Sequence, residues 1–371
     1  MQKITCGFYL IQKASFVVSV FLLVSCSFSF LNKDTSLTLV DFNDLEFDNI
    51  EYQKSLTAFL NSCKVIAKYE EEYQISRKLV SVRVVDYRDA CENALNLQED
   101  LTREKFVKFL KQHFKVYKLK NNRDSFFTGY FLPEIEASFE YSDTYKYPIY
   151  KSPATLDNIK HLLSRKEINN GALQHLNLEI AWAKNDIDLF FLHIQGSGVL
   201  RLPDGERYLL SYDKSNGHQY YAIGKYLKEH KKLVNINGYS IREWLSDHPE
   251  QKNTILNMNA SFIFFKLLPD IAVLGAEGSI LTADGSIAID KTLYPYGLPM
   301  LIETKIPDYY NYNQVRDYSN ILITQDTGSD IIGKNRGDIY FGYGKKAQYQ
   351  ANLMKYYGKM YIFIPNNAIA H

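Results

Sequence analysis

Two segments near the C-terminus, Ile321-Leu-Ile-Thr-Gln-Asp326-Thr-Gly328 and Gly337-Asp-Ile-Tyr-Phe341, determine the fold class that the sequence predicts. Each joins a short run of β-branched, apolar or aromatic residues to an aspartate and a glycine, a pattern typical of a strand that meets a turn. Similar runs occur at 300–304 and 360–364, again with glycines between them. The chain after about residue 270 is therefore predicted to form a compact β barrel or sandwich.

The N-terminal part has a helical pattern instead. Apolar residues recur at helical spacing across 54–69 and across 102–116, so we expect an amphipathic helix in each range. Ser240 followed by Glu243 resembles a capping box, and it predicts the start of a short helix that ends before Pro249. These helices are expected to contribute to the core and carry no chemistry of their own.

Composition excludes several classes of function. The chain has 371 residues, 46% hydrophobic, with Lys+Arg 43 against Asp+Glu 42 and a net charge of +1. That length is enough for two or three domains, and the balanced charge gives no basic surplus for nucleic acid. The eight histidines never form a His-x-x-x-His pair, and no cysteine pair has metal spacing. We therefore expect neither nucleic acid nor a metal site.

The N-terminus resembles a lipoprotein signal. Residues 1–25 contain two lysines and no acid, and their apolar run is shorter than the roughly 20 residues of a membrane span. Leu23-Val-Ser-Cys26 is similar to a bacterial lipobox, which would make Cys26 the lipidated N-terminus and place the protein in the periplasm. Ser27 after this cysteine favours the outer membrane. The alternative is an uncleaved signal anchor. Cys63 and Cys91 either pair in that oxidising compartment or remain buried thiols.

Asp326-Thr-Gly328 also resembles the active-site tripeptide of aspartic proteases. Those enzymes need two such carboxylates that share a proton, and only one copy of the tripeptide occurs here. A subunit that dimerises would still need a flap and a second half, yet only 41 residues follow Asp330. A protease is therefore a poor interpretation.

An ordered set of motifs points elsewhere. The set comprises Phe127-Thr-Gly-Tyr-Phe-Leu-Pro133, Tyr147-Pro-Ile-Tyr150, Asp186 to Gly198, Asn216-Gly-His218, Asn259 to Phe265, Ile287-Ala-Ile-Asp290, Asp326-Thr-Gly328 and Gly337-Asp-Ile-Tyr340. In this order and spacing the motifs closely resemble the family of membrane-bound lytic murein transglycosylase A, with its C-terminal three-aspartate (3D) domain. The resemblance spans roughly residues 55 to 365.

The resemblance implies a fold that is mainly β with N-terminal helices. It consists of a double-psi β-barrel domain and a smaller inserted β domain, with a glycan groove between them. The expected divisions are a signal peptide over 1–25, a helical part of the main domain over 26–130, an inserted domain over about 131–194, and the rest of the main domain over 195–371. The barrel part of that last range covers about 270–365.

The family activity is cleavage of the β-1,4 bond between N-acetylmuramic acid and N-acetylglucosamine without water. The muramoyl C6 hydroxyl attacks its own C1 and forms a 1,6-anhydro product, so no second carboxylate is needed to activate water. One carboxyl group serves first as acid and then as base, and it must begin protonated. The resemblance implies no cofactor. The expected partners are peptidoglycan glycan strands and, through Cys26, the membrane; regulating proteins are not identified.

Family motifs also imply roles for single residues. Asp338 matches the catalytic acid, although from the residues alone Asp326 remains an alternative. If two neighbouring strand ends bring these carboxyl groups close, Asp326 would raise the pKa of Asp338 as a like charge. Asp290 is a supporting residue whose simplest role is to stabilise a turn. The positions that match the substrate-binding groove are Thr128, Tyr130, Gln195, Ser197 and Asp326, and tight packing of turns is the alternative for them.

Some positions depart from the family pattern. Leu132, Ser329, Gln219 and Gly285 stand where many relatives have Glu, Gly, Pro and Arg, respectively. These changes affect expected substrate contacts more than the acid, because Asp338 and its neighbours are intact. Two further hypotheses therefore remain: a murein-binding lipoprotein without chemistry, and a hydrolase in which Asp326 or another carboxylate activates water.

Overall fold

The computed structural model describes residues 36–120, 123–154, 163–231, 233–234, 236–328 and 330–371. The predicted signal peptide over 1–25 and the lipidation site Cys26 lie outside these residues. None of the described helices combines the length and the apolar character needed to cross a membrane.

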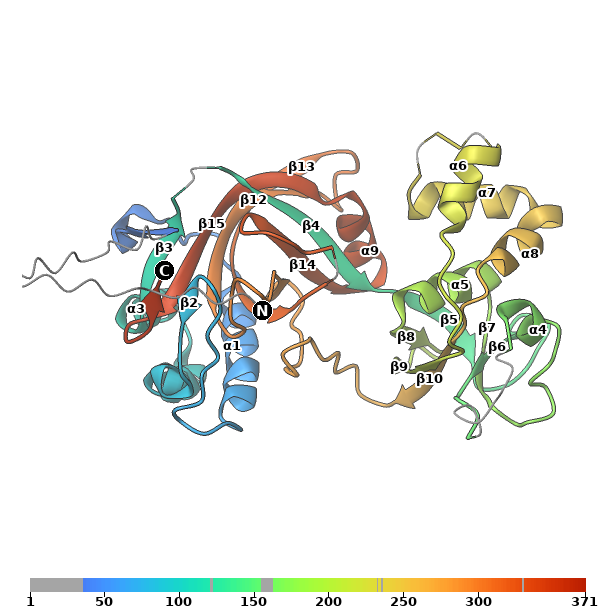
Figure 1. Cartoon of the computed structure of the whole chain (residues 1–371), viewed down its shortest axis with the longest axis horizontal. Helices are drawn as coiled ribbons and strands as arrows, with labels where there is room; N and C mark the ends of the chain where they lie inside the picture. The colour runs from blue at the N-terminus through green and yellow to red at the C-terminus, as the bar shows by residue number, and fades with distance from the viewer. Residues whose placement is uncertain (1–35, 121–122, 155–162, 232, 235, 329) are drawn as a thin grey trace, which may run out of the picture. The chain divides into compact units, whose positions relative to one another are not determined.

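Six strands close into a barrel (Figure 1). They are β4 (Ser125–Leu132), β11 (Ser286–Ala288), β12 (Pro299–Pro307), β13 (Val315–Asp326), β14 (Arg336–Tyr343) and β15 (Lys355–Pro365). The order around the barrel is β15-β12-β13-β11-β14-β4, and antiparallel pairing of β15 with β4 closes it. All four β-type runs in the sequence lie in these strands, so the predicted barrel is confirmed.

Further elements extend the barrel domain. Strands β1 (Leu37–Val40) and β3 (Phe114–Leu119) continue the sheet beside β15. Other elements of this domain are β2 (Val80–Ser81), β16 (Ile369–Ala370), α9 (Gly344–Leu353), and the 3-10 helices η1 (Phe42–Asp44), η2 (Val84–Tyr87) and η3 (Gln98–Asp100).

The segment Ile321–Ile323 of strand β13 is buried on both faces. Helix α1 (Tyr52–Ile66) lies against it, and the Ser55 Oγ donates a hydrogen bond of 2.7 Å to the Ile321 carbonyl. Ile321, Leu322 and Ile323 are at most 1% exposed. This double coverage explains why their run is continuously apolar, since a strand with one solvent face would alternate.

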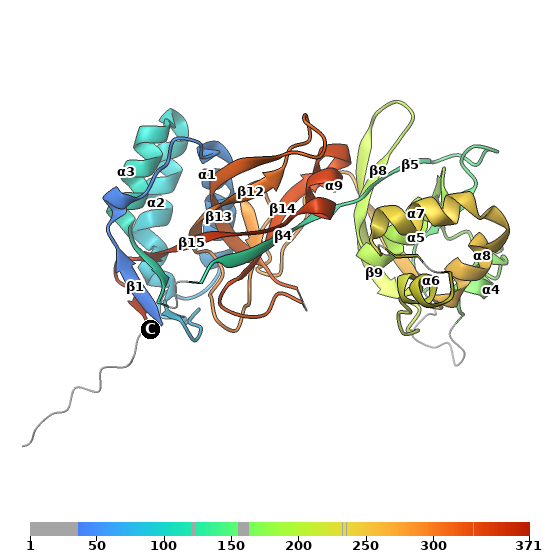
Figure 2. The same ribbon diagram turned by 90° about the horizontal axis from the view of Figure 1, so that it is seen from above.

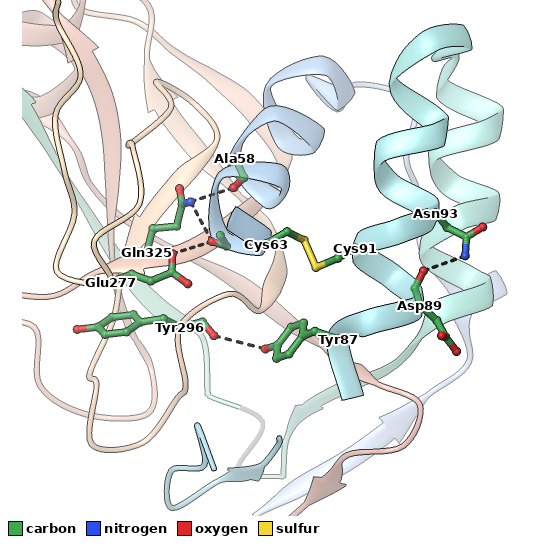
Figure 3. The surroundings of a disulfide bond; sticks show 10 residues. Ala58, Cys63, Tyr87, Asp89, Cys91, Asn93, Glu277, Tyr296 and Gln325 are labelled. Atoms are coloured by element: carbon green, nitrogen blue, oxygen red, sulfur yellow. Dashed lines mark hydrogen bonds between the residues drawn. A yellow bond between two sulfur atoms is a disulfide. The ribbon is translucent and has the colours of Figure 1, made fainter. Parts of the chain in front are cut away.

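The predicted N-terminal helices are present. The range 54–69 corresponds to α1, and 102–116 corresponds to α3 (Arg103–His113), which ends early because Phe114 begins β3. Helix α2 (Arg88–Leu97) lies between them in sequence. A disulfide joins Cys63 of α1 to Cys91 of α2, with 5.7 Å between their Cα atoms (Figure 3). Of the two states that the sequence left open, the structure therefore has the paired one.

A second sheet forms the insert. Its strands are β5 (Glu134–Ser138), β6 (Tyr147–Tyr150), β7 (Glu179–Ala183), β8 (Gly198–Arg201), β9 (Arg207–Ser215) and β10 (Ile263–Leu268), in the order β10-β9-β8-β5-β7-β6. Strands β8 to β10 share this sheet, so it extends well beyond residue 194, where the sequence placed the end of the insert. The discrepancy arises because β5 pairs with the distant β8, a contact that local patterns do not reveal.

The insert also carries helices, which Figure 2 shows grouped around α5. They are α4 (Arg165–Asn169), α5 (Asp186–Gln195), α6 (Ile223–Lys231), α7 (Gly238–Asp247) and α8 (Pro249–Met258). Helix α7 ends before Pro249 as predicted, but its predicted start is wrong. The cap is Asn237, whose side chain accepts from the Tyr239 and Ser240 N–H groups, and Ser240 lies inside the first turn.

Candidate active site

Backbone pairing brings Asp326 and Asp338 to the same level of the barrel. Ala288 of the short strand β11 pairs with Asp326 of β13 on one side and with Asp338 of β14 on the other. On its far side, β14 runs parallel to β4, and Asp338 pairs with Thr128. The two aspartates therefore lie on strands separated by one intervening strand, where the sequence analysis had considered two adjacent strand ends.

Among the described residues, one group donates a hydrogen bond to the Asp338 carboxyl group. The Thr128 hydroxyl donates to Asp338 Oδ1, and the Arg336 Nη2 donates to the same Thr128 oxygen over 2.6 Å. Because Arg336 occupies an acceptor position of that oxygen, the Thr128 hydrogen is directed toward Asp338. Asp338 Oδ2 accepts no hydrogen bond from the part of the chain that the structure describes, so this oxygen is available to exchange a proton.

Burial raises the pKa of Asp338 above the usual range of an aspartate. The Thr128 hydrogen bond and the Arg336 charge oppose this shift, and the like charge of Asp326 adds to it. Loss of solvation is the largest of these effects because it disfavours the charged form. Asp338 consequently keeps its proton to a higher pH than an exposed aspartate would.

Asp326 is held by three donors. Its Oδ1 accepts from the Ala276 N–H at 3.0 Å and from the Thr327 N–H at 2.9 Å, and its Oδ2 accepts from the Tyr130 hydroxyl at 2.9 Å. Tyr130 also packs against Tyr340, with 5.1 Å between ring centroids. Burial and the Asp326 charge raise the pKa of Tyr130 well above its ordinary value, so its hydroxyl remains a donor. This arrangement orients the Asp326 carboxyl group and leaves Asp338 as the freer of the two.

Asp290 stabilises a turn. It is 8% exposed, and it accepts from the Thr292 N–H and hydroxyl and from the Gly333 N–H at 2.8 Å. Burial raises its pKa, but the hydrogen bonds from Gly333 and Thr292 outweigh burial and leave the pKa lowered. Asp290 thereby ties together the two loops that follow β11 and precede β14.

Gln195 and Ser197 lie in the insert, around the end of α5. The chain turns there at Gly196, which has a φ of 82°, a backbone conformation that favours glycine. The Ser197 Oγ accepts from the Tyr212 N–H at 3.0 Å, whereas Gln195 is exposed and lines a cavity of about 270 Å³. The structure thus brings Thr128, Tyr130, Asp326 and Asp338 together, and among the described residues it gives no contact between that group and Gln195 or Ser197.

Several residues of this site were not identified from the sequence. Arg336 and Tyr340 flank Asp338 at a spacing of two in β14, which places their side chains on the same face of the strand. Strand alternation could therefore have identified both. The Ala276 N–H comes from a loop outside β14 and has no such signal. No group of three His, Cys, Asp or Glu side chains in the described ranges is arranged to hold a metal ion.

Comparisons with known proteins agree with this fold. The model of the MltA specific insert domain matches residues 126–266, and that of the 3D domain matches residues 285–364. The chain is 33% identical over 240 residues to membrane-bound lytic murein transglycosylase A of Vibrio cholerae, a match that covers 63% of this chain. The match spans 64% of that relative, just under two thirds of its length.

Two solved structures are similar over most of the chain. The lytic transglycosylase LtgG of Burkholderia pseudomallei has 28% identity and a TM-score of 0.65, covering 90% of this chain and 96% of that one. The Escherichia coli MltA structure with bound chitohexaose has 25% identity and a TM-score of 0.66, covering 89% and 94%. The fold class that the resemblance implied is therefore confirmed.

Proposed function

We propose that this chain, which carries the insert domain and the 3D domain of the lytic murein transglycosylase A family, is a peptidoglycan lytic transglycosylase. The proposed reaction cleaves the β-1,4 bond between N-acetylmuramic acid and N-acetylglucosamine and releases a 1,6-anhydromuramoyl end. The relative from Vibrio cholerae bears the name of this activity, and the similar Escherichia coli structure contains chitohexaose.

The observation that carries the proposal is the state of Asp338. Its burial raises its pKa, one oxygen accepts from Thr128, and the other has no partner in the described chain. A general acid needs a proton that it retains near the working pH and an oxygen from which to deliver it. Asp326, whose carboxyl oxygens accept three hydrogen bonds, fits that role less well.

A single carboxyl group is sufficient for this reaction. Asp338 donates its proton to the glycosidic oxygen as the bond between that oxygen and the muramoyl C1 breaks. The resulting carboxylate then accepts the proton of the muramoyl C6 hydroxyl as this oxygen bonds to C1. The proton that Asp338 loses in the first half is regained in the second, and no water or cofactor is consumed.

The remaining candidate residues receive supporting roles in this proposal. Thr128 orients the Asp338 carboxyl group. Asp326 and Tyr130 together present a polar surface that can form hydrogen bonds with sugar hydroxyl and acetamido groups. Gln195 and Ser197 of the insert are proposed to contact the glycan as well. Asp290 is proposed to act through the turn that it stabilises.

We also propose that the protein is a lipoprotein of the periplasm, anchored to the outer membrane through Cys26. The lipobox-like Leu23-Val-Ser-Cys26 and the following Ser27 support this placement. The relatives are named as membrane-bound proteins. A single lipidated terminus would leave the domains free to reach murein beside the membrane.

The decisive experiment is mass spectrometry of purified murein incubated with the full chain in detergent, alongside Asp338→Asn. We expect anhydromuropeptides from the wild type and a rate about 10²–10⁴-fold lower from the variant, which is the contribution of a positioned general acid. Asn replaces the acid with a group of the same shape, so folding should be unchanged.

Two controls separate the alternatives. Asp326→Asn tests the neighbouring carboxyl group, and Asp317→Asn replaces an exposed aspartate of the same strand, β13. Full activity of Asp338→Asn would transfer the role of acid to Asp326. Reducing ends in place of anhydro ends would identify a hydrolase, and unchanged murein that still binds the protein would identify a binding module.

A further inference from the structure

Glu277 is a partly buried glutamate in a loop that contacts the end of β13. The Glu277 Oε2 accepts from the Ser62 hydroxyl of α1 at 2.7 Å and from the Ser279 hydroxyl at 2.6 Å, while its Oε1 is buried without a partner in the described chain. Figure 3 shows Glu277 beside Gln325, facing α1 near Cys63. Ser62 precedes Cys63, so the disulfide to α2 braces the helix end that holds this carboxyl group.

The backbone of Gly275, Ala276 and Glu277 contacts the end of β13. The Glu277 N–H donates to the Gln325 carbonyl at 3.1 Å, and the preceding Ala276 N–H donates to Asp326 Oδ1 at 3.0 Å. Gly275 approaches so closely that an added Cβ would lie 2.4 Å from the Gln325 carbonyl oxygen. Consequently, a shift of this loop cannot occur without a change in what holds Asp326.

Side chains reinforce the same link. Gln325 Nε2 donates to the Ser62 hydroxyl oxygen at 3.0 Å and to the Ala58 carbonyl at 2.9 Å. The Gln325 Oε1 accepts from the Ser286 hydroxyl at 2.5 Å. Helix α1, the Glu277 loop and β13 thus form one hydrogen-bonded unit that ends at Asp326.

No cation neutralises Glu277 within salt-bridge distance in the described chain. The titratable groups that face Glu277 are the phenols of Tyr87 from η2 and of Tyr296 from the loop before β12. The carboxyl group of Asp326 is bound to the N–H of the preceding residue, Ala276. Burial and the Glu277 charge raise the pKa of Tyr87, and burial is also the main cause for Tyr296, so both phenols stay neutral. Burial raises the pKa of Glu277 to about 7, although the Ser279 and Ser62 hydrogen bonds lower it.

We infer that Glu277 is a positioning residue for the reaction, which holds the Ala276 N–H against Asp326 and does so best as a carboxylate. This inference rests on the proposed function. Ser62 and Ser279 make charge-assisted hydrogen bonds to the ionised group, and such bonds are roughly twice as strong as neutral ones. Protonation of Glu277 weakens the hydrogen bonds from Ser62 and Ser279, so the loop at 275–277 is held less firmly. The Ala276 N–H, which orients Asp326, is then released.

The test compares Glu277→Gln with the wild type from about pH 5 to about pH 9, using kcat/KM for anhydromuropeptide release from murein. Gln has the shape of the protonated acid, and Asp338 titrates in both proteins, so its effect cancels in the ratio of the two rates. We expect equal rates at the acid end. At the alkaline end the wild type should be about fivefold faster, with the midpoint of the change near neutrality.

Two further variants separate this role from a merely structural one. Ser62→Ala removes a donor to the carboxylate and should lower the rate mainly at the alkaline end. Glu303→Gln is the matched control, because Glu303 of β12 contacts Lys359 at 3.4 Å and takes no part in this network. Its rate relative to the wild type should not change with pH.

Hydrogen exchange at the Ala276 amide provides a readout that needs no activity. At alkaline pH this amide should exchange about fivefold faster in Glu277→Gln than in the wild type, after correction for intrinsic rates. A ratio of rates that is flat with pH, or exchange that is equal in both proteins, would overturn the inference. If the wild type releases no anhydro product, the proposed function fails, and the exchange data alone decide whether Glu277 holds the loop.

Discussion

Arg165 of the insert and Glu277 of the barrel domain both lie at least partly buried with no ion pair to the described residues, and the two groups behave in opposite ways. In the insert, Arg165 is 3% exposed and donates to the carbonyls of Asn259 and Ser261 and toward His193 Nδ1. In the barrel domain, Glu277 accepts from two hydroxyl groups. No ion pair to either group is found in the described chain.

The difference lies in where each group titrates. Burial lowers the pKa of Arg165 only to about 9, so it stays cationic at neutral pH. Burial and the Arg165 charge lower the pKa of His193 well below its ordinary value, which keeps this ring a neutral acceptor. Glu277, with a pKa of about 7, changes its charge in the physiological range. Loss of solvation therefore leaves Arg165 a cation throughout the neutral pH range, whereas Glu277 beside the candidate site changes its charge within that range.

Arg165→Met should produce the largest change in stability of this comparison. Met fills a similar space but leaves three acceptors, two buried and one partly buried, without their donor, so we expect the insert to lose about 3 kcal/mol of unfolding free energy. Because Arg165 keeps its charge, the loss should be the same at pH 6 and pH 8. Urea denaturation monitored by hydrogen exchange of insert and barrel peptides measures it in each part.

Arg207→Met is the control for this variant. Arg207 is exposed and pairs with Glu134 at 3.0 Å, and surface pairs of this kind contribute about 0–1 kcal/mol. A loss for Arg165→Met no larger than that of the control, or one that appears at only one pH, would show that the buried cation is not a constant structural element.

Glu277→Gln should have a smaller effect on stability, and one that depends on pH. The folded pKa of about 7 lies above the ordinary value of 4.5, so the folded state keeps a proton that the unfolded chain has already lost. Stability is therefore lost as the pH rises from 4.5 to about 7, by at most about 3 kcal/mol. We expect the variant to match the wild type at pH 5 and to be about 2 kcal/mol more stable at pH 8.

Thermal or urea unfolding at these two pH values measures that difference. The stabilised variant should nevertheless be the slower enzyme at alkaline pH, because the ionised carboxyl group that destabilises the fold is also the one that holds the loop. A variant that is more stable at pH 5 as well would mean that packing, and not ionisation, distinguishes Glu from Gln at this position.

Local sequence patterns predicted the barrel well and the insert poorly, for a physical reason. Four of the barrel strands contain apolar runs, and Ile321–Ile323 of β13 are buried on both faces, so these segments have a strong pattern of their own. The pairing of distant segments escapes such patterns in both parts, since β5 pairs in parallel with β8 in the insert and β4 pairs in parallel with β14 in the barrel. Such pairings depend on the closure of a long loop, which no window of neighbouring residues records.

The candidate site shows the same limit. Asp338 is identifiable from its motif, and Arg336 from strand alternation, because both lie in β14. Glu277 lies in a glycine-containing loop, where a charged residue is normally expected to be exposed. Its partial burial results in part from α1, more than 200 residues earlier in the sequence, whose Ser62 contacts it only in the folded chain.

Tyr130→Phe should produce the smallest change in stability of the series, and it separates the orientation of Asp326 from the proton transfer by Asp338. The variant removes the donor to Asp326 Oδ2 but keeps the ring that packs on Tyr340 and both backbone donors to Oδ1. We expect kcat/KM to fall about tenfold, with unfolding changed by less than about 1 kcal/mol. Tyr340→Phe is the control, since the Tyr340 hydroxyl makes no hydrogen bond to the described residues. A loss for Tyr130→Phe as large as that for Asp338→Asn would mean that orientation of Asp326 is as important as the proton itself, and equal rates for both Phe variants would remove Asp326 from the reaction.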